Sequence, residues 1–415
     1  MVASAYVAHL ARRAQEYGVD IEGRAGAIRV DMARVKARKD VISLESRTGV
    51  EKWLKGMPGC TVYEGHGRFE GPKQVRIDLT GGGSETIGAE RIFINVGGRA
   101  LVPPMPGLDS ISYLTNSSMM DLDVLPKHLI VVCGSYIGLE FGQMFRRFGS
   151  EVTIIEMADR LISREDPEIS AAILDILQRE GINVRLKAKC ISFANDNGQI
   201  AARVDCDSGD PEVRGGTHAL LAVGRVPNTD DLGLDRAGIT VDARGYIAVD
   251  DQLRTNVPGI WAVGDCNGQG AFTHTSYNDA EIVVGNLLDN DPRGVSKRIS
   301  TYALFIDPPL GRAGQSEAEV RKSGRRALVA TRPMVRIRRA VEKGEPYGLM
   351  KIIVDAETHQ ILGAAILGTG GDEVIHSILD VMYAKAPYTL LTHAMHIHPT
   401  VSEYIPTVLG DLKPL

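Results

Sequence analysis

Two side chains near the end of the 415-residue chain have the types and spacing of a proton-transfer pair. His398 and Glu403 stand five positions apart in the segment His-Pro-Thr-Val-Ser-Glu. An imidazole exchanges protons near neutral pH, and a neighbouring carboxylate can orient its ring. Such a pair can move protons for a thiol, yet no two cysteines stand close enough for a CxxC or CxxxxC motif. This scatter predicts neither a disulfide scaffold nor a metal site. The cysteines are Cys60, Cys133, Cys190, Cys206 and Cys266.

A second group of residues has the position of a dinucleotide-binding turn. The segment Cys133-Gly-Ser-Tyr-Ile-Gly138 follows an apolar run and opens an amphipathic one, where the fingerprint G-x-G-x-x-G belongs. Only Gly138 is in register, because Cys133 and Ser135 replace the first two glycines and Gly134 lies between them. Backbone N–H groups of such a turn bind a pyrophosphate. The β-carbon of residue 133 is expected to crowd the turn.

The acidic residue after the next apolar run bears on the choice of nucleotide. Glu156 stands where a carboxylate would accept a hydrogen bond from a ribose 2′-hydroxyl and repel a 2′-phosphate. This position favours NADH over NADPH. The alternative interpretation is a surface acid at the end of a strand.

A third feature is the run from Thr255 to Asp265, which ends in Gly264-Asp265. Glycine allows a ligand to approach the backbone closely, and the carboxylate can accept hydrogen bonds from a polyol. Downstream, the segment from Thr275 to Asp279 has a capping-box pattern and predicts that a helix begins there. The N-terminus of that helix would stabilise negative charge on a nearby ring.

These groups need elements that hold them in place. Residues 128–132 read as an apolar strand, 138–148 as a helix and 151–156 as the next strand. Strand, helix and strand in this order form a βαβ unit, which predicts a parallel sheet in a doubly wound α/β domain. Residues 94–99 also echo residues 221–225, either as parts of two related domains or as two unrelated strand exits.

The two ends of the chain have different patterns. Residues 1–18 predict a helix that stops at Gly18. From about residue 299, predicted strands at 349–354 and 361–367 precede a helix at 372–385. This order suits a C-terminal α+β domain.

Together these motifs resemble the class I FAD-dependent pyridine nucleotide-disulfide oxidoreductases, such as dihydrolipoamide dehydrogenase, glutathione reductase and mercuric reductase. The resemblance implies that Gly264 and Asp265 hold the flavin ribitol, that Tyr136 covers the nicotinamide pocket and that Glu140 lies beside the nicotinamide. The segments 95–99 and 222–228 resemble the family's flavin-passing strand and its G-R-x-P-N signature. The implied nucleotide-contacting residues are Gly97, Gly134, Ser135, Tyr136, Ile137, Gly138, Glu140, Glu156 and Gly224.

The same resemblance implies an architecture and a catalytic pair. The expected fold is α/β, with two Rossmann-like nucleotide-binding domains, the FAD one incomplete, and a C-terminal α+β dimerisation domain. The implied segments are 1–113 and 249–298 for FAD, 114–248 for NAD(P), and 299–415 for dimerisation. The implied cofactors are FAD and NAD(P)H. His398 would return a thiol proton, oriented by Glu403, in the partner subunit's site of an obligate homodimer.

The chain also departs from the family pattern. The first βαβ unit with its own fingerprint and the redox C-x-x-x-x-C are not found in the 415 residues. We therefore expect a chain that is truncated at its N-terminus and impaired in passing hydride from NADH through FAD to a disulfide or metal acceptor. One alternative is a non-catalytic, dimeric nucleotide-binding remnant. Another is a flavin reductase of metals or quinones that needs no paired cysteines.

Composition narrows the class of protein. The chain is 44% hydrophobic and 24% charged, with a formal net charge of −5. These values are typical of a globular protein of two to four domains. No basic run suggests a nucleic-acid partner, and no apolar run has the length of a membrane span or the form of a signal peptide. We expect a cytoplasmic protein that acts on small molecules or metal ions.

Overall fold

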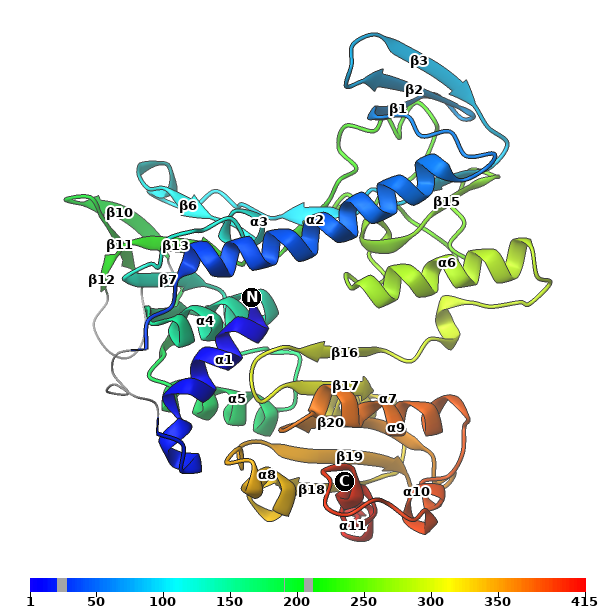
Figure 1. Ribbon diagram of the computed structural model, residues 1–415. Helices are drawn as coiled ribbons and strands as arrows, with labels where there is room; N and C mark the ends of the chain where they lie inside the picture. The colour runs from blue at the N-terminus through cyan, green and yellow to red at the C-terminus, as the bar shows by residue number, and fades with distance from the viewer. Residues whose placement is uncertain (21–27, 190, 205–211) are drawn as a thin grey trace. The chain divides into compact units, whose positions relative to one another are not determined.

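The computed structural model describes residues 1–20, 28–189, 191–204 and 212–415. The chain forms two compact units (Figure 1). The first contains residues 1–39, 102–223 and 299–415, and the second contains residues 40–101 and 224–298. In the described residues, no helix has the length and apolar character needed to cross a membrane. The four-segment division predicted from the sequence stays a prediction.

The first unit holds the predicted parallel sheet. Its five strands lie in the order β6-β13-β7-β8-β9, and every neighbouring pair is parallel. The predicted strand at 128–132 is β7, and the predicted strand at 151–156 is β8. The strands are β6 (Tyr113–Leu114), β7 (His128–Val132), β8 (Glu151–Ile155), β9 (Asn183–Arg185) and β13 (His218–Leu221).

Both faces of this sheet are buried. Leu129 and Val131 of β7 pack into one core with α4 (Tyr136–Phe148) and α5 (Pro167–Arg179), while Ile130 and Val132 pack into another. Successive side chains of a strand point to opposite faces, so a strand buried on both sides is continuously apolar. The second core includes the antiparallel sheet β10 (Ser192–Asp196), β11 (Gln199–Arg203) and β12 (Glu212–Gly216).

The C-terminal part of this unit is the predicted α+β region. Its antiparallel sheet has the order β16-β17-β20-β19-β18-β21, and α9 (Gly371–Tyr383) packs on β17 and β20. The predicted strands at 349–354 and 361–367 are β19 and β20, and the predicted helix at 372–385 is α9. The strands are β16 (Thr301–Leu304), β17 (Leu310–Gly314), β18 (Ala327–Pro333), β19 (Leu349–Asp355), β20 (Ile361–Leu367) and β21 (Lys413–Pro414).

Short helices complete the first unit. The predicted N-terminal helix is α1 (Val2–Arg12), which packs on α4 and continues as a 3₁₀ turn to Tyr17 before Gly18 ends it at φ 73°. Arg12 donates to the Arg147 carbonyl, and Arg13 donates to the Gly344 carbonyl at 2.8 Å. The other helices are α3 (Asn116–Met119), α7 (Glu317–Ser323), α8 (Arg338–Glu342), α10 (Thr389–His393) and α11 (Ile405–Gly410).

The second unit is built from small sheets. The strands β4 and β15 form a parallel pair, β5 and β14 an antiparallel pair, and β1, β2 and β3 an antiparallel sheet. The helix α2 (Met32–Gly56) has residues in both units, and α6 (Thr273–Leu287) lies in the second. The strands are β1 (Gly65–Gly71), β2 (Gln74–Leu79), β3 (Ser84–Gly88), β4 (Ile92–Ile94), β5 (Gly98–Ala100), β14 (Arg225–Pro227) and β15 (Ile260–Ala262).

The structure refines one expectation from the sequence and corrects another. The ends of the echoed segments pair with each other, since Gly98 to Ala100 of β5 run antiparallel to Arg225 to Pro227 of β14. The predicted capping box at 275–279 is wrong: α6 begins at Thr273, after Phe272, which makes no side-chain cap hydrogen bond. Thr275 already lies within the first turn of the helix, so it cannot be the residue that caps it.

Candidate nucleotide- and flavin-binding site

The 133–138 turn leads from β7 into α4. A β-carbon on Gly138 would lie 2.1 Å from the Cys133 carbonyl oxygen, so only glycine fits at that position. Ser135 precedes α4 in an extended conformation and makes no side-chain cap hydrogen bond. The N–H groups of the first turn of a helix have no partner within the helix, and the helix dipole adds positive charge there. The turn can therefore hold an anion such as a pyrophosphate.

Cys133 takes the conformation that the fingerprint reserves for glycine. Its φ is 90°, in the left-handed region, where a β-carbon costs on the order of 1–3 kcal/mol. Burial, reinforced by the Glu156 carboxylate, raises the pKa of the Cys133 thiol to about 11. The crowding expected from the sequence is thus backbone strain, and the thiol is poorly suited to form a thiolate.

Glu156 braces the same turn from the end of β8. The Gly134 N–H donates to Glu156 Oε2 at 2.6 Å, and the Ala158 N–H donates to Oε1 at 2.7 Å. A carboxylate has about four lone-pair positions, so these two bonds leave capacity for a ribose hydroxyl. The role of Glu156 in selecting NADH stays a prediction, and bracing the turn is a task that sequence reasoning missed.

Two further predicted residues lie on α4. Arg164 Nε donates to the Tyr136 hydroxyl at 2.8 Å, and burial raises the pKa of Tyr136 to about 12. Glu140 Oε1 accepts from the Phe305 N–H at 2.9 Å, and burial raises the pKa of this carboxyl. The side chains of Tyr136 and Glu140 thus both meet neighbours outside their own helix. Nothing in the sequence around Arg164 points to its contact with Tyr136.

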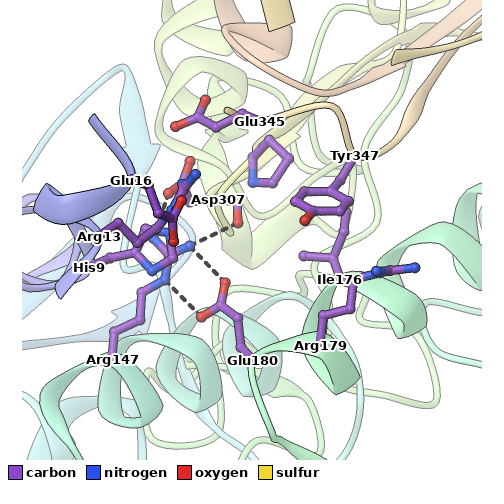
Figure 2. Close-up of a pocket in the computed structure, with 11 residues that line it drawn as sticks. His9, Arg13, Glu16, Arg147, Ile176, Arg179, Glu180, Asp307, Glu345 and Tyr347 are labelled. Carbon is purple, nitrogen blue, oxygen red and sulfur yellow. Dashed lines mark hydrogen bonds and ion pairs between the residues drawn. The ribbon is translucent and has the colours of Figure 1, made fainter. Parts of the chain in front are cut away.

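The pocket in Figure 2 is a separate feature of the first unit. Arg147, only 5% exposed, pairs there with Glu180 at 2.7 Å and with Asp307 (Figure 2). The cavity measures about 180 Å³ and is also lined by His9 and Glu345. No predicted site residue lines this pocket. Its paired charges join α4 and the end of α5 to the loop between β16 and β17 of the C-terminal sheet.

The 264–265 turn of the second unit follows β15. Gly264 has a φ of 73°, and a β-carbon there would lie 2.7 Å from both Asn95 Oδ1 and Ser276 Oγ. Asp265 Oδ2 pairs with Arg225 Nη2 at 3.2 Å, and the same nitrogen donates to the Gly98 carbonyl at 2.6 Å. The signature-motif arginine thus orients the predicted ribitol ligand, a role that its place in the motif could have suggested.

Asp279 fixes the same turn from α6. Its side chain is 0% exposed, and its Oδ2 accepts from the Gly264 N–H and from Asn267 Nδ2, both at 2.8 Å. Its Oδ1 pairs with Arg298. Sequence reasoning missed Asp279 as a functional candidate, because the chain itself does not reveal that a helix carboxylate meets a distant turn.

The surroundings of this turn fit a polar ligand such as FAD. Gly97 has a φ of 67°, and its β-carbon position is open, with nothing within 4 Å. Arg298 Nη1 is buried and has no hydrogen-bond partner in the part of the chain that the structure describes. The Asp265 side chain remains 23% exposed, so its carboxylate is accessible to a polyol. Gly224, the other predicted glycine of this unit, has a φ of 135°.

The predicted proton-transfer pair is formed in the first unit. His398 Nδ1 lies 3.1 Å and 3.0 Å from the two carboxylate oxygens of Glu403. The imidazole is 77% exposed, whereas Glu403 is largely covered. With Nδ1 held by a carboxylate, Nε2 is the nitrogen left to exchange a proton. His398 and Glu403 are therefore brought together as predicted, and His396 bonds only to the nearby Ala394 carbonyl at 3.0 Å among the described residues.

Comparison with known protein families gives two adjacent matches. The family described as pyridine nucleotide-disulphide oxidoreductase matches residues 10–280. Its dimerisation domain matches residues 300–409. Both matches fall on the segments that carry the two turns, the His398–Glu403 pair and the C-terminal sheet.

Individual proteins agree with these matches. The chain is 36% identical over 385 residues to a probable pyridine nucleotide-disulfide oxidoreductase, RclA, of Escherichia coli, covering 92% of this chain and 86% of RclA. It is 32% identical over 374 residues to mercuric reductase of Streptomyces lividans, covering 90% of this chain and 78% of that protein. It is 28% identical over 410 residues to dihydrolipoyl dehydrogenase of Haloferax volcanii, covering 98% and 84%.

Solved structures of flavoprotein disulfide reductases also match this chain. The structure of RclA, titled an HOCl-induced flavoprotein disulfide reductase from Escherichia coli, matches with a TM-score of 0.86 at 32% identity, covering 99% of this chain and 89% of that one. A Cu(II) complex of RclA matches with a TM-score of 0.85 at 33% identity, covering 97% and 87%. The α/β fold expected from the sequence is thereby confirmed.

Proposed function

The chain belongs to the FAD-dependent pyridine nucleotide-disulfide oxidoreductases, and from this premise we propose that it takes hydride from NADH onto FAD. Bound FAD supplies the chemistry: it accepts a hydride and passes the two electrons on to an acceptor. The residues of this chain bind and orient the two cofactors and hold the protons that accompany transfer. NADH is the proposed donor, with the Glu156 carboxylate facing the ribose.

One observation carries the proposal. The uncapped N-terminus of α4 is part of the 133–138 turn, since the helix begins at Tyr136, and Glu156 accepts from the Gly134 N–H at 2.6 Å. A helix N-terminus and a braced glycine turn provide N–H donors for a pyrophosphate. In the second unit, Arg225 and Asp279 orient the 264–265 turn, which we assign to the flavin ribitol.

We assign proton transfer to His398. Glu403 holds its Nδ1 at 3.0 Å, which leaves Nε2 to accept and return a proton. The family dimerisation domain at residues 300–409 supports a homodimer. We propose that the exposed His398 acts in the partner subunit's site.

The proposed acceptor is a disulfide or a metal ion. The 415 residues contain no C-x-x-x-x-C pair of their own. Because the E. coli relative forms a Cu(II) complex, Cu(II) is a suitable first acceptor to test. One NADH carries two electrons, so it would reduce two Cu(II) ions to Cu(I) and release one proton. A cytoplasmic location stays a prediction.

The alternative of a non-catalytic remnant has less support. The match to RclA spans 92% of this chain and gives no support for the expected impairment or for a non-catalytic remnant. Impaired transfer to a disulfide therefore stays a prediction that a direct assay must test.

Anaerobic reduction tests the proposal. Protein loaded with FAD is mixed with NADH, and the flavin absorbance band is followed. We expect the band to bleach with NADH, less with NADPH, and to recover when Cu(II) is added, with a Cu(I)-specific chelator reporting the product. Protein that takes up no FAD, or bound flavin that NADH does not bleach, would overturn the proposal. If the flavin band recovers with a disulfide but not with Cu(II), only the metal ion is excluded as acceptor, and the disulfide remains.

A further inference from the structure

Arg164 lies between two tyrosine rings beside the 133–138 turn. Its Cζ is 4.2 Å from the ring centroid of Tyr136 and 4.6 Å from that of Tyr302. The two rings meet edge to face, with centroids 5.5 Å apart. A guanidinium within about 6 Å of a ring face is attracted by the ring's quadrupole. Arg164 therefore holds both rings at once.

Tyr302 is the anchored member of this group. Its hydroxyl donates to the carboxylate of Glu165, which is buried and also pairs with the buried Arg312 at 3.3 Å. Tyr302 belongs to β16, the edge strand of the C-terminal sheet. Because an ion pair and a sheet strand hold it, its ring can serve as a fixed support for Arg164.

Tyr136 is the less firmly held member. It is the first residue of α4 and only partly buried, and its hydroxyl shares a hydrogen bond with that of Tyr302. Besides the stacking, Arg164 Nε donates to the Tyr136 hydroxyl at 2.8 Å. Arg164 itself is solvent-exposed, which makes the contact weak enough to be exchanged.

We propose that Arg164 is a positioning residue that holds the Tyr136 ring in its resting place, so that the nicotinamide end of NADH must displace this contact to bind. The inference rests on the proposed function, because it assigns Tyr136 to the nicotinamide pocket. The adenosine end and the pyrophosphate do not meet the ring, so their binding is independent of Arg164. An exposed cation–π contact corresponds to about a two- to five-fold change in affinity.

Calorimetric titration with two ligands tests this inference. One ligand is tetrahydro-NAD, which has a nicotinamide-like ring but cannot donate hydride, and the other is ADP-ribose, which has no nicotinamide. For Arg164→Met we expect tetrahydro-NAD to bind about two- to five-fold more tightly, with ADP-ribose unchanged. Arg164→Lys keeps the charge and should lie between the wild type and Arg164→Met.

The matched control is Arg244→Met. Arg244 is an exposed arginine over the ring of Tyr246, at 5.1 Å, in the second unit, and its loss should change neither affinity. If Arg164→Met weakens both ligands, Arg164 is a phosphate ligand and the inference is wrong. If neither affinity changes, the stack is only a surface contact and the inference is wrong as well. If wild-type protein binds neither ligand, the proposed nucleotide site itself fails.

Discussion

The 133–138 turn and the 264–265 turn are both proposed to hold a nucleotide cofactor, but the carboxylates that brace them lie in different surroundings. The first follows a strand of a five-stranded parallel sheet whose residues alternate between two apolar cores. The second follows β15, which pairs with β4 and whose residues also alternate between two apolar cores, and it is held by the buried carboxylate of Asp279. Both turns are therefore braced by a carboxylate, but that of Glu156 is partly exposed, whereas that of Asp279 is fully buried and also pairs with Arg298.

The two turns also differ in the atoms that surround them. At the first turn, a β-carbon on Gly138 would meet the Cys133 backbone carbonyl, whereas at the second a β-carbon on Gly264 would meet the side chains of Asn95 and Ser276. At the second, Phe93 of β4 is 48% exposed and stacks on Trp261 at 5.1 Å, whereas the residues of β15 itself are buried. Because the Asp279 carboxylate is fully buried, its polar contacts are costly when one partner is lost.

The largest expected effect is at Asp279. Asp279→Ala leaves Arg298 without its ion-pair partner and the Gly264 N–H without its acceptor. Breaking a buried ion pair from one side costs about 3–5 kcal/mol of unfolding free energy. We expect a loss of this size by chemical denaturation, together with loss of bound flavin.

Two companion variants sharpen this test. Asp291→Ala breaks an exposed pair with Arg293 and should change stability by no more than about 0.5 kcal/mol. The double variant Asp279→Leu with Arg298→Met removes both charges, and it should recover stability without recovering flavin affinity, because the Gly264 N–H still lacks its acceptor. A stable Asp279→Ala protein that retains flavin would show that charge does not hold this turn.

The next effect is at Gly138. Gly138→Ala places a β-carbon 2.1 Å from the Cys133 carbonyl oxygen, and overpacking of this kind costs about 1–3 kcal/mol. We expect NADH affinity to fall at least about tenfold, because the turn must open to fit the methyl group. The control is Gly49→Ala in α2, where nothing lies within 4 Å and alanine should stabilise the helix by about 0.5–1 kcal/mol. Unchanged nucleotide binding in Gly138→Ala would show that the close packing at Gly138 does not control nucleotide affinity.

The smallest effect concerns the two cysteines beside the turns. Burial raises the pKa of both thiols, that of Cys133 to about 11. At pH 8 about one Cys133 thiol in a thousand is therefore a thiolate, and only the thiolate reacts with iodoacetamide. Labelling of Cys133, followed by peptide mass spectrometry, should rise about tenfold per pH unit until the pH nears 11. Fully buried Cys266 should stay unlabelled while the protein is folded. Rapid labelling of Cys133 at pH 8 would show that its turn is open.

Much of this arrangement could be predicted. The strands β7, β8, β19 and β20 match their predicted ranges closely because an apolar run, a glycine turn and a helix period are local patterns. The pairing of His398 with Glu403 was also predicted, since a five-residue spacing keeps the two side chains close. The start of α6 was predicted wrongly, because a threonine three residues before a polar residue is only a weak signal for a helix cap.

Local patterns of apolar, glycine and acidic residues determine the βαβ unit, the two turns and the proton-transfer pair, because each depends on residues only a few positions apart. The partners that hold these groups come from far along the chain. Asp279 reaches Gly264, Arg225 reaches Asp265, and Tyr302 meets Arg164 only after the strands and helices have packed. Side-chain contacts between distant segments depend on the three-dimensional path of the backbone, and no spacing in the sequence encodes that path directly.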